Sequence, residues 1–197
     1  MAKLLYQGHS SIRLVTSRGT VVYLDPFGGD GYDLPADLVL VTHEHFDHNN
    51  VRLVTLKKEG RILRSSDFLT NGEYLTEEFP GITVESVPAT NSHHPKESGV
   101  GFLITVDGVK IYDAGDTSKT DFMRDRLSKE AIDYAFLPID GIFNMGAKEA
   151  SECAEIIGAK HTVPFHMKPG ALFDEKKASA FRAEGKLVLR PGTEVAL

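Results

Sequence analysis

The sequence predicts an α/β (α+β) protein in which two β-sheets pack face to face and helices cover them from outside. Three observations support this fold class. Many β-rich runs alternate with a few helical segments, and the chain has two similar halves, each made of a hairpin, a connection and a buried strand. No low-complexity tract or proline-rich linker divides the chain. We therefore expect a single domain over residues 1–197, a length sufficient for a core of its own.

The two halves begin with similar hairpins. Residues 11–29 hold two β-rich runs joined at residues 17–19, and residues 99–117 hold a second pair joined at Asp107 and Gly108, a strong turn signal. Each pair ends in aspartates followed by small residues. Each half then continues to a short apolar run preceded by Asp, at 36–45 and at 132–141, which we expect to be buried strands.

The remaining elements are predicted from periodicity and stop signals. Helical patterns cover 121–130, 147–158 and 174–184, and glycines at 158 and 185 end the last two. Further strands are expected at 82–88, 161–165 and 186–190.

Composition narrows the functional classes. Cys153 is the only cysteine, so an intrachain disulfide and a thiolate-rich metal site are both excluded. The formal net charge of -6 argues against a large nucleic-acid footprint, which needs clustered Lys and Arg. No stretch resembles a signal segment or a membrane span, so a soluble, cytoplasmic protein is expected.

The stretch "VLVTHEHFDHNN", residues 39–50, is the most informative segment. Side chains at i and i+2 of an extended chain face the same way, so His43 and His45 can hold one ion. Asp47 and His48 follow the turn and point toward a second position, as a second ion about 3.5–4 Å away requires. Imidazole and carboxylate without thiolate suit zinc best, with manganese or iron as substitutes. A polar surface turn is the alternative, but a desolvated cluster gains nothing unless a cation binds.

The motif "THEHFDH" resembles the H-x-H-x-D-H signature of the metallo-β-lactamase superfamily. The segments "GHSS", "DPF", "HPK", "GDT", "MGAKEA" and "PFH" occur in the order found in its metal-dependent hydrolase branch, similar to the ascorbate-6-phosphate lactonase group. This resemblance spans the chain and implies a four-layer αββα sandwich of two mixed sheets with a binuclear metal site at one edge.

The resemblance also implies a ligand set. His43 and His45 would bind the first metal with a histidine from "NSHHPKESG", where His94 is favoured and the adjacent His93 remains open. The second metal would be bound by Asp47, His48, Asp116 and His166, with Asp116 bridging both ions. The structural alternative for Asp116 is a turn residue beside Gly115, although Asp113 suits that role better.

His9 in "GHSS" and Asp25 before Pro26 resemble positions that approach the metal centre. We expect them to orient ligands or substrate through hydrogen bonds, as His93 would if it is not a ligand. An ordinary turn histidine and a strand-ending aspartate are the alternatives. Lys96 and Lys168 flank presumed ligands and could hold an anion, but most such lysines are solvated.

The predicted function is hydrolysis by a hydroxide that two divalent metal ions activate by lowering the pKa of water from 15.7 toward about 7. Asp47 or Asp116 would accept a proton as the intermediate collapses. A lactone or a phosphorylated small molecule is the preferred substrate. An RNA-processing nuclease and a non-catalytic metal-dependent ligand-binding protein are the alternatives. A small-molecule partner is expected, a membrane or nucleic-acid partner is not, and a homo-oligomer is left open.

Overall fold

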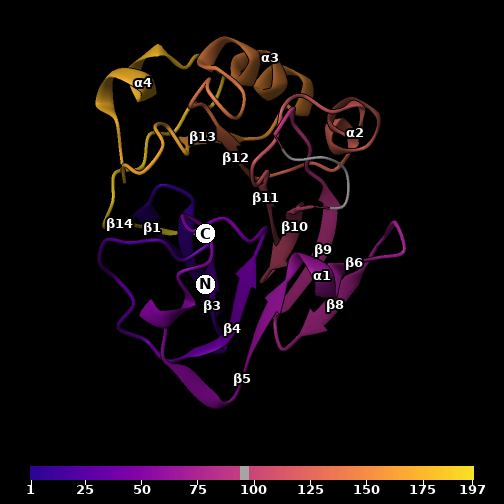
Figure 1. Ribbon diagram of the computed structural model, residues 1–197. Helices are drawn as coiled ribbons and strands as arrows, with labels where there is room; N and C mark the ends of the chain where they lie inside the picture. The colour runs from indigo at the N-terminus through magenta and orange to yellow at the C-terminus, as the bar shows by residue number, and fades with distance from the viewer. Residues whose placement is uncertain (94–97) are drawn as a thin grey trace.

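The computed structural model describes residues 1–93 and 98–197, which form two six-stranded mixed sheets packed face to face (Figure 1). The first sheet has the strand order β14 (Thr193–Ala196), β1 (Lys3–Gly8), β2 (Ser11–Val15), β3 (Val21–Leu24), β4 (Ala36–Val41) and β5 (Leu56–Arg64). The second has the order β13 (His161–Phe165), β12 (Tyr134–Pro138), β11 (Val109–Asp113), β10 (Val100–Val106), β9 (Ile82–Pro88) and β8 (Thr76–Phe79). A short hairpin, β6 (Leu69–Thr70) with β7 (Glu73–Tyr74), accompanies them.

The two sheets repeat one pairing pattern, which confirms the two predicted hairpins. In the first sheet β2 pairs antiparallel with β3, and β3 then pairs parallel with β4. In the second sheet β10 pairs antiparallel with β11, and β11 pairs parallel with β12. Parallel neighbours end at the same edge of a sheet. The residues that follow β3 and β4 therefore lie at one edge of the first sheet, and those that follow β11, β12 and β13 lie at one edge of the second.

Side-chain alternation divides the apolar residues into layers. On β4, Leu38 and Leu40 face the cluster between the sheets, whereas Val39 and Val41 face the outer side of the first sheet. A third cluster packs the outer face of the second sheet against the helices, with buried residues such as Leu137. One apolar cluster therefore lies between the two sheets, and one lies on the outer face of each sheet.

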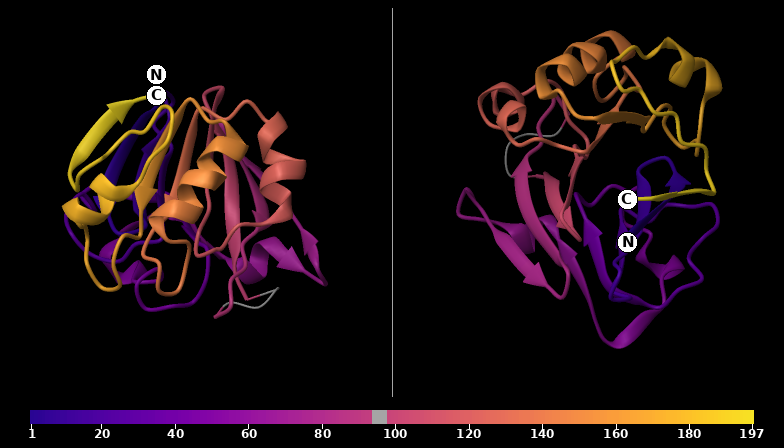
Figure 2. Two further views of the ribbon diagram at one scale, coloured as in Figure 1. Left: turned by 90° about the horizontal axis from the view of Figure 1, so that it is seen from above. Right: turned by 180° about the vertical axis from the view of Figure 1, so that it is seen from behind.

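The outer layers differ between the two sheets. The second sheet is covered by α2 (Asp121–Asp125), α3 (Ala147–Ile157) and α4 (Glu175–Ala180), seen from above in Figure 2. The outer face of the first sheet is covered by side chains such as Tyr32, Leu34 and Val51, the last from the 3-10 turn η1 (Val51–Leu53). The predicted fold class is confirmed, with few helices and two mixed sheets.

Two predicted helices are shorter than expected. The pattern at 121–130 forms α2 and then the 3-10 turn η2 (Leu127–Lys129). The pattern at 174–184 ends at Ala180, because Phe181 turns to an extended conformation and its side chain is buried in the helix-facing cluster. Lys186 Nζ donates to the carbonyl oxygens of Ala178 and Phe181 and so satisfies the end of the helix.

The strand predicted at 186–190 is wrong, and the reason lies in its neighbour β13. Lys186 forms a single bridge with Thr162, and Leu187 N donates to Thr162 O. The next residue of β13 that faces this side is Pro164, two positions on, and proline has no N–H to donate. The ladder therefore stops after one bridge.

Several elements were not predicted: β1, β5 to β8, β14 and the short helix α1 (Ser65–Phe68). Within the described ranges, no helix is long and apolar enough to cross a membrane.

We predict that Phe102→Ala lowers the free energy of unfolding by about 3–5 kcal/mol, the usual cost of removing a buried phenyl ring. Phe102 is fully buried between the sheets, and its ring centroid lies 5.1 Å from that of Phe68. Urea denaturation measures the change. The control Leu56→Ala, at a 37% exposed residue, should change stability by less than about 0.5 kcal/mol. Equal effects of the two substitutions would contradict this assignment of the core.

Candidate metal centre

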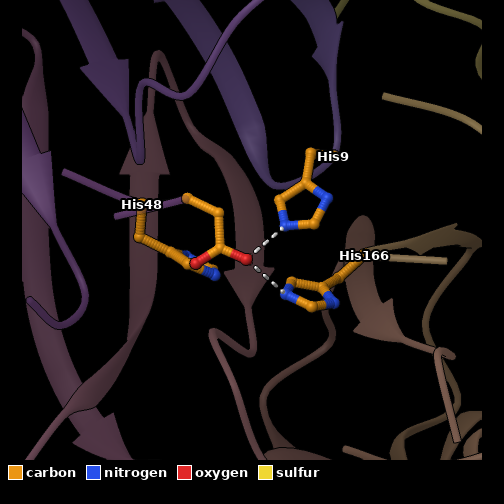
Figure 3. Close-up of side chains that lie close together, drawn as sticks. His9, His48 and His166 are labelled. Carbon is orange, nitrogen blue, oxygen red and sulfur yellow. Dashed lines mark hydrogen bonds and ion pairs between the residues drawn. The ribbon is translucent and has the colours of Figure 1, made fainter. Parts of the chain in front are cut away.

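The site lies where strands of both sheets end. His9 follows β1, His43 and His48 follow β4, Asp116 follows β11 and His166 follows β13. All five side chains are buried. Figure 3 shows the rings of His9, His48 and His166 turned toward one another, although 157 positions of sequence separate the first from the last. The strand ends therefore bring together residues from distant parts of the chain.

Hydrogen bonds fix the orientation of His43 and His48. His48 Nδ1 lies 2.7 Å from Asp25 Oδ2, and an ionised carboxylate can only accept, so Nδ1 carries the proton. Thr42 Oγ1 donates to the same Asp25 oxygen at 2.6 Å and lies 3.0 Å from His43 Nδ1. Because the Thr42 hydroxyl proton is already used, His43 Nδ1–H is the donor to Thr42. Both rings therefore direct Nε2 into the site.

His9 and His166 are oriented in the same way. His9 Nδ1 donates to the carbonyl oxygen of Ala171 at 3.0 Å, and His166 Nδ1 lies 3.2 Å from Asp140 Oδ2. A carbonyl oxygen can only accept, so the Ala171 contact places a proton on His9 Nδ1. The 3.2 Å contact with Asp140 is an ion pair without hydrogen-bond geometry and favours the same tautomer in His166. Nε2 of each ring faces the centre, toward Asp47 Oδ2 in His9 and toward Asp116 Oδ1 in His166.

The two oxygens of Asp116 reach different imidazoles. Oδ1 lies 3.4 Å from His48 Nε2 and 3.4 Å from His166 Nε2, whereas Oδ2 lies 3.9 Å from His43 Nε2. Two atoms bound to one zinc ion at about 2.0–2.1 Å in tetrahedral geometry lie about 3.3–3.4 Å apart. The two separations from Oδ1 match this value, and the separation of Oδ2 from His43 Nε2 is about 0.5 Å longer. One oxygen of Asp116 thus faces His48 and His166, and the other faces His43.

Asp47 lies beside His9 and His166, in the second group of possible metal ligands. Its Oδ2 lies 3.2 Å from His9 Nε2 and 3.8 Å from His166 Nε2. Dashed lines in Figure 3 lead from one carboxylate oxygen to these two histidines. His9, Asp47, His48 and His166 offer ligand atoms within 4.8 Å of one another, and so do His43, His48 and Asp116. The structure therefore brings two ligand groups together, joined at His48.

Unsatisfied buried atoms test whether a cation suits these groups. His48 Nε2, His166 Nε2 and Asp116 Oδ1 are buried and have no hydrogen-bond partner among residues 1–93 and 98–197. A buried polar atom left without a partner costs about 1–3 kcal/mol. Three such atoms, all of them metal-ligating types directed at one region, fit a site for divalent cations.

The same cluster shifts the pKa values of its members. Burial raises the pKa of Asp47, but the hydrogen bond from His9 and the charge of His48 outweigh burial and hold that pKa far below its usual range. Burial lowers the pKa of His48, but the charges of Asp116 and Asp25 outweigh it and raise the pKa of His48 to about 9. Without a metal, His48 therefore carries the positive charge that the carboxylates need.

Asp113 lies behind the ligands and behaves differently. It is fully buried, and its Oδ1 accepts the N–H of Gly115 at 3.0 Å, which agrees with the turn role expected for it. Burial, together with the charge of Asp25, raises the pKa of Asp113 to about 8. This carboxyl group is therefore protonated at neutral pH in the metal-free protein.

Three site residues have unusual backbone conformations. His9, Asp25 and His166 adopt φ values of 56°, 42° and 41°, in the left-handed region that favours glycine. Such a conformation costs on the order of 1 kcal/mol or more and persists only where the surrounding structure imposes it. Two backbone bonds, from His166 N to His9 O and from His9 N to Leu172 O, fix these turns against each other.

Besides the residues of these two ligand groups, the sequence predicts three further histidines, His45, His93 and His94, as ligands or as neighbours of the metals. His45 is exposed, with its ring centroid 4.7 Å from that of His43. His94, the favoured third ligand of the first metal, lies outside the described residues. His93 lies at the rim, where its N–H donates to Asn91 Oδ1 and its ring contacts Phe143 at 5.3 Å.

Sequence reasoning missed Asp140 and Thr42. Asp140 is fully buried and follows β12; besides its contact with His166, its Oδ2 accepts a hydrogen bond from Asn144 Nδ2 at 2.8 Å. A signal for it was present: "PIDG" ends the buried strand of the second half, as the histidine motif ends that of the first. Thr42 carried no comparable signal, because its role depends on the placement of Asp25.

A cleft of about 400 Å³ opens onto the cluster. Its lining residues are Glu44, His45, Phe46, Asp47, Asp116, Phe143, His166 and Pro169. The cleft thus joins residues of both ligand groups, and its volume lies within the range of small-molecule sites.

Comparisons with known proteins agree with this geometry. Residues 3–166 match the Beta-lactamase superfamily domain. A UPF0173 metal-dependent hydrolase of Thermococcus onnurineus is 33% identical, covering 98% of each chain, and one of Methanoregula boonei is 36% identical over 83% of this chain and 81% of its own. A crystal structure from Parabacteroides distasonis, assigned as a metal-dependent hydrolase, superposes with a TM-score of 0.76 at 26% identity and covers 96% of this chain and 92% of its own.

Fold and sequence together define the class of protein: the chain is a metal-dependent hydrolase of the metallo-β-lactamase superfamily. Within that superfamily it belongs to the UPF0173 metal-dependent hydrolase family.

We predict that Asp140→Asn weakens zinc binding by about 10- to 100-fold, because an amide that presents N–H to His166 Nδ1 no longer fixes the tautomer. Competition against a chromophoric chelator measures the affinity. The matched control is Asp133→Asn, at the other end of β12, where the carboxylate pairs with Lys160 at 2.6 Å. Unchanged affinity in Asp140→Asn, or an equal loss in the control, would remove Asp140 from the site.

We also predict that the metal-free protein loses stability as pH rises from 6.5 to 9. His48 has its pKa raised from 6.5 to about 9, so its stabilising proton is fully held below 6.5 and is lost as pH rises through 9. Asp113, raised from 3.8 to about 8, acts in the same direction. Bound zinc would replace the His48 proton and reduce this dependence. Urea unfolding of stripped and zinc-loaded protein at both pH values measures it; stability that rises with pH in the stripped protein would contradict the assignment.

Proposed function

We propose that the cluster binds two divalent metal ions, zinc in the first place and manganese or iron as substitutes, and that this centre hydrolyses a small-molecule substrate. The observation that carries the proposal is the common orientation of four buried imidazoles. Each has an oxygen atom at Nδ1 and directs Nε2 toward Asp47 or Asp116. Ligands without thiolate, as here, suit these ions.

In this proposal the ligands form two groups. His43 and His45 bind the first ion with a histidine of the 93–94 pair, and the other group, Asp47, His48 and His166, binds the second. Asp116 joins both, as its two oxygens lie near different imidazoles. His9 orients Asp47 through the 3.2 Å contact, and Asp25 and Asp140 orient His48 and His166.

When bound, such ions lower the pKa of water toward neutrality and polarise the bond to be cleaved. The chain's own residues then manage protons and position. Asp47 or Asp116 would accept a proton as the intermediate collapses and pass it to the leaving group. His9, with its Nδ1–H fixed on Ala171, keeps Asp47 Oδ2 facing the cleft.

The proposed substrate is a lactone or a phosphorylated small molecule. The cleft volume of about 400 Å³ supports a compact substrate, and the sequence resemblance to the ascorbate-6-phosphate lactonase group supports a cyclic ester. The net charge of -6 speaks against RNA. Salt-sensitive binding of single-stranded RNA would favour the nuclease alternative instead.

We predict that chelator-stripped protein hydrolyses none of a panel of lactones, phosphodiesters and phosphorylated sugars, and that zinc restores activity. Asp116→Ala should lower kcat/KM by at least about 10²-fold, because it removes the carboxylate proposed to bind both ions. The matched control is Asp121→Ala, an exposed aspartate in the first turn of α2 that pairs with Arg124. Full turnover by the stripped protein, or by Asp116→Ala, would overturn the proposed function.

A further inference from the structure

Two phenylalanines line the cleft. Phe46 lies between His45 and Asp47 and is 74% exposed; Phe143 lies in the loop after β12 and is 42% exposed. Large apolar side chains that remain exposed beside a cleft often mark a contact surface for a ligand. Of the six exposed large hydrophobic side chains among the described residues, these two line the cleft above the ligands.

Contacts position the Phe46 ring and the loop that carries Phe143. Ring centroids of Phe46 and Phe27 lie 6.1 Å apart in an edge-to-face contact, and Phe27 in turn contacts His9 at 4.9 Å. The loop that carries Phe143 is fixed by Asp140 Oδ1, which accepts the N–H groups of Ile142 and Phe143, each at 2.7 Å. Rigid aromatic walls contact a ligand at low entropic cost.

Among the residues that the structure describes, the lining of the cleft offers no cationic side chain to an anionic group on the substrate body. Asp47 and Asp116 lie at its floor and Glu44 at its rim, whereas no lysine or arginine lines it among the residues that the structure describes. Arg64 approaches the rim, but both of its short contacts, at 2.7 and 2.9 Å, are with Glu44. Lys168 is exposed and lies outside the lining. A phosphate on the substrate body would find phenyl rings and no cationic side chain among these lining residues.

We propose that the substrate is an uncharged ester, best a lactone, whose body carries an apolar chain or ring that packs between Phe46 and Phe143. This inference rests on the proposed hydrolytic function and chooses among its substrates, with the phosphorylated ones disfavoured. In the reaction, water adds across the ring ester C–O bond and gives one hydroxycarboxylate and one proton.

The test uses three γ-lactones: the unsubstituted ring, the ring with a pentyl chain, and the ring with a chain of equal length that ends in phosphate. For the zinc-loaded protein, kcat/KM should be at least about 10-fold higher for the pentyl lactone than for either of the others, as an apolar wall discriminates by added methylene groups. Phe46→Ala and Phe143→Ala should each lower the value for the pentyl lactone about 10-fold and leave that of the unsubstituted lactone within about 2-fold.

The matched control is Ile142→Ala, which removes a 61% exposed apolar side chain from the same loop without changing the cleft lining. It should leave all three values within about 2-fold. A preference for the phosphate-ended lactone, or equal losses on all lactones in the phenylalanine variants, would overturn the inference.

A binding measurement separates this inference from the proposed function. The lactam analogue of the pentyl lactone, which resists hydrolysis, should bind the zinc-loaded protein about 10-fold more tightly than it binds Phe143→Ala. If no lactone is hydrolysed, the proposed function fails, while the lactam titration still reports on the cleft. Equal lactam affinity in the wild type and the variant would reject the apolar contact even if lactones are hydrolysed.

Discussion

The burial of negative charge between two sheets is the constraint on which the rest of the site depends. Five carboxyl groups are buried around one edge of the sandwich: Asp25, Asp47, Asp113, Asp116 and Asp140. An ionised carboxylate is very costly to bury unless opposite charge or hydrogen bonds compensate it. In the metal-free protein, protons provide part of that compensation, on His48 and on Asp113. Divalent cations bound by the Nε2 atoms would provide it in the working enzyme.

The fold supplies this arrangement through parallel strand ends and tight turns. Because β3 and β4 end together and β11 to β13 end together, each sheet contributes a group of polar residues to the shared edge. Asp25 and Asp140 have equivalent tasks in the two halves, since each follows a strand and contacts Nδ1 of a histidine. Asp140 has a second task, because it also fixes the loop of Phe143. Ligand orientation and the shape of the cleft therefore depend on one carboxylate.

Much of the fold could be predicted because its signals are local. The Asp107–Gly108 turn defined one hairpin, and the strands at 82–88 and 161–165 have the predicted bounds. The strand at 186–190 failed because its pairing depends on Pro164 in another segment, and β14 was missed because it forms only by pairing with β1 at the far end of the chain. Edge strands depend on such partners, which a single sequence does not reveal.

In the candidate site, too, some residues could be predicted from local sequence and others depend on distant contacts. His43, Asp47 and His48 form one compact motif, whereas His9 and His166 could be assigned only through resemblance. The structure now brings them to one centre. Asp140 and Thr42 act through contacts that arise after folding, so their roles depend on three-dimensional placement. The left-handed turns at His9 and His166 likewise depend on each other, through the bond from His166 N to His9 O.

The most direct test of the shared metal centre is the number of zinc ions that one chain binds. Native mass spectrometry of chelator-stripped protein titrated with zinc should show saturation at two ions per chain, with Asp116→Ala reduced to one or none at the same zinc concentration. Saturation at zero ions in the wild type, or undiminished binding of two ions in Asp116→Ala, would contradict the account of a shared centre at the strand ends.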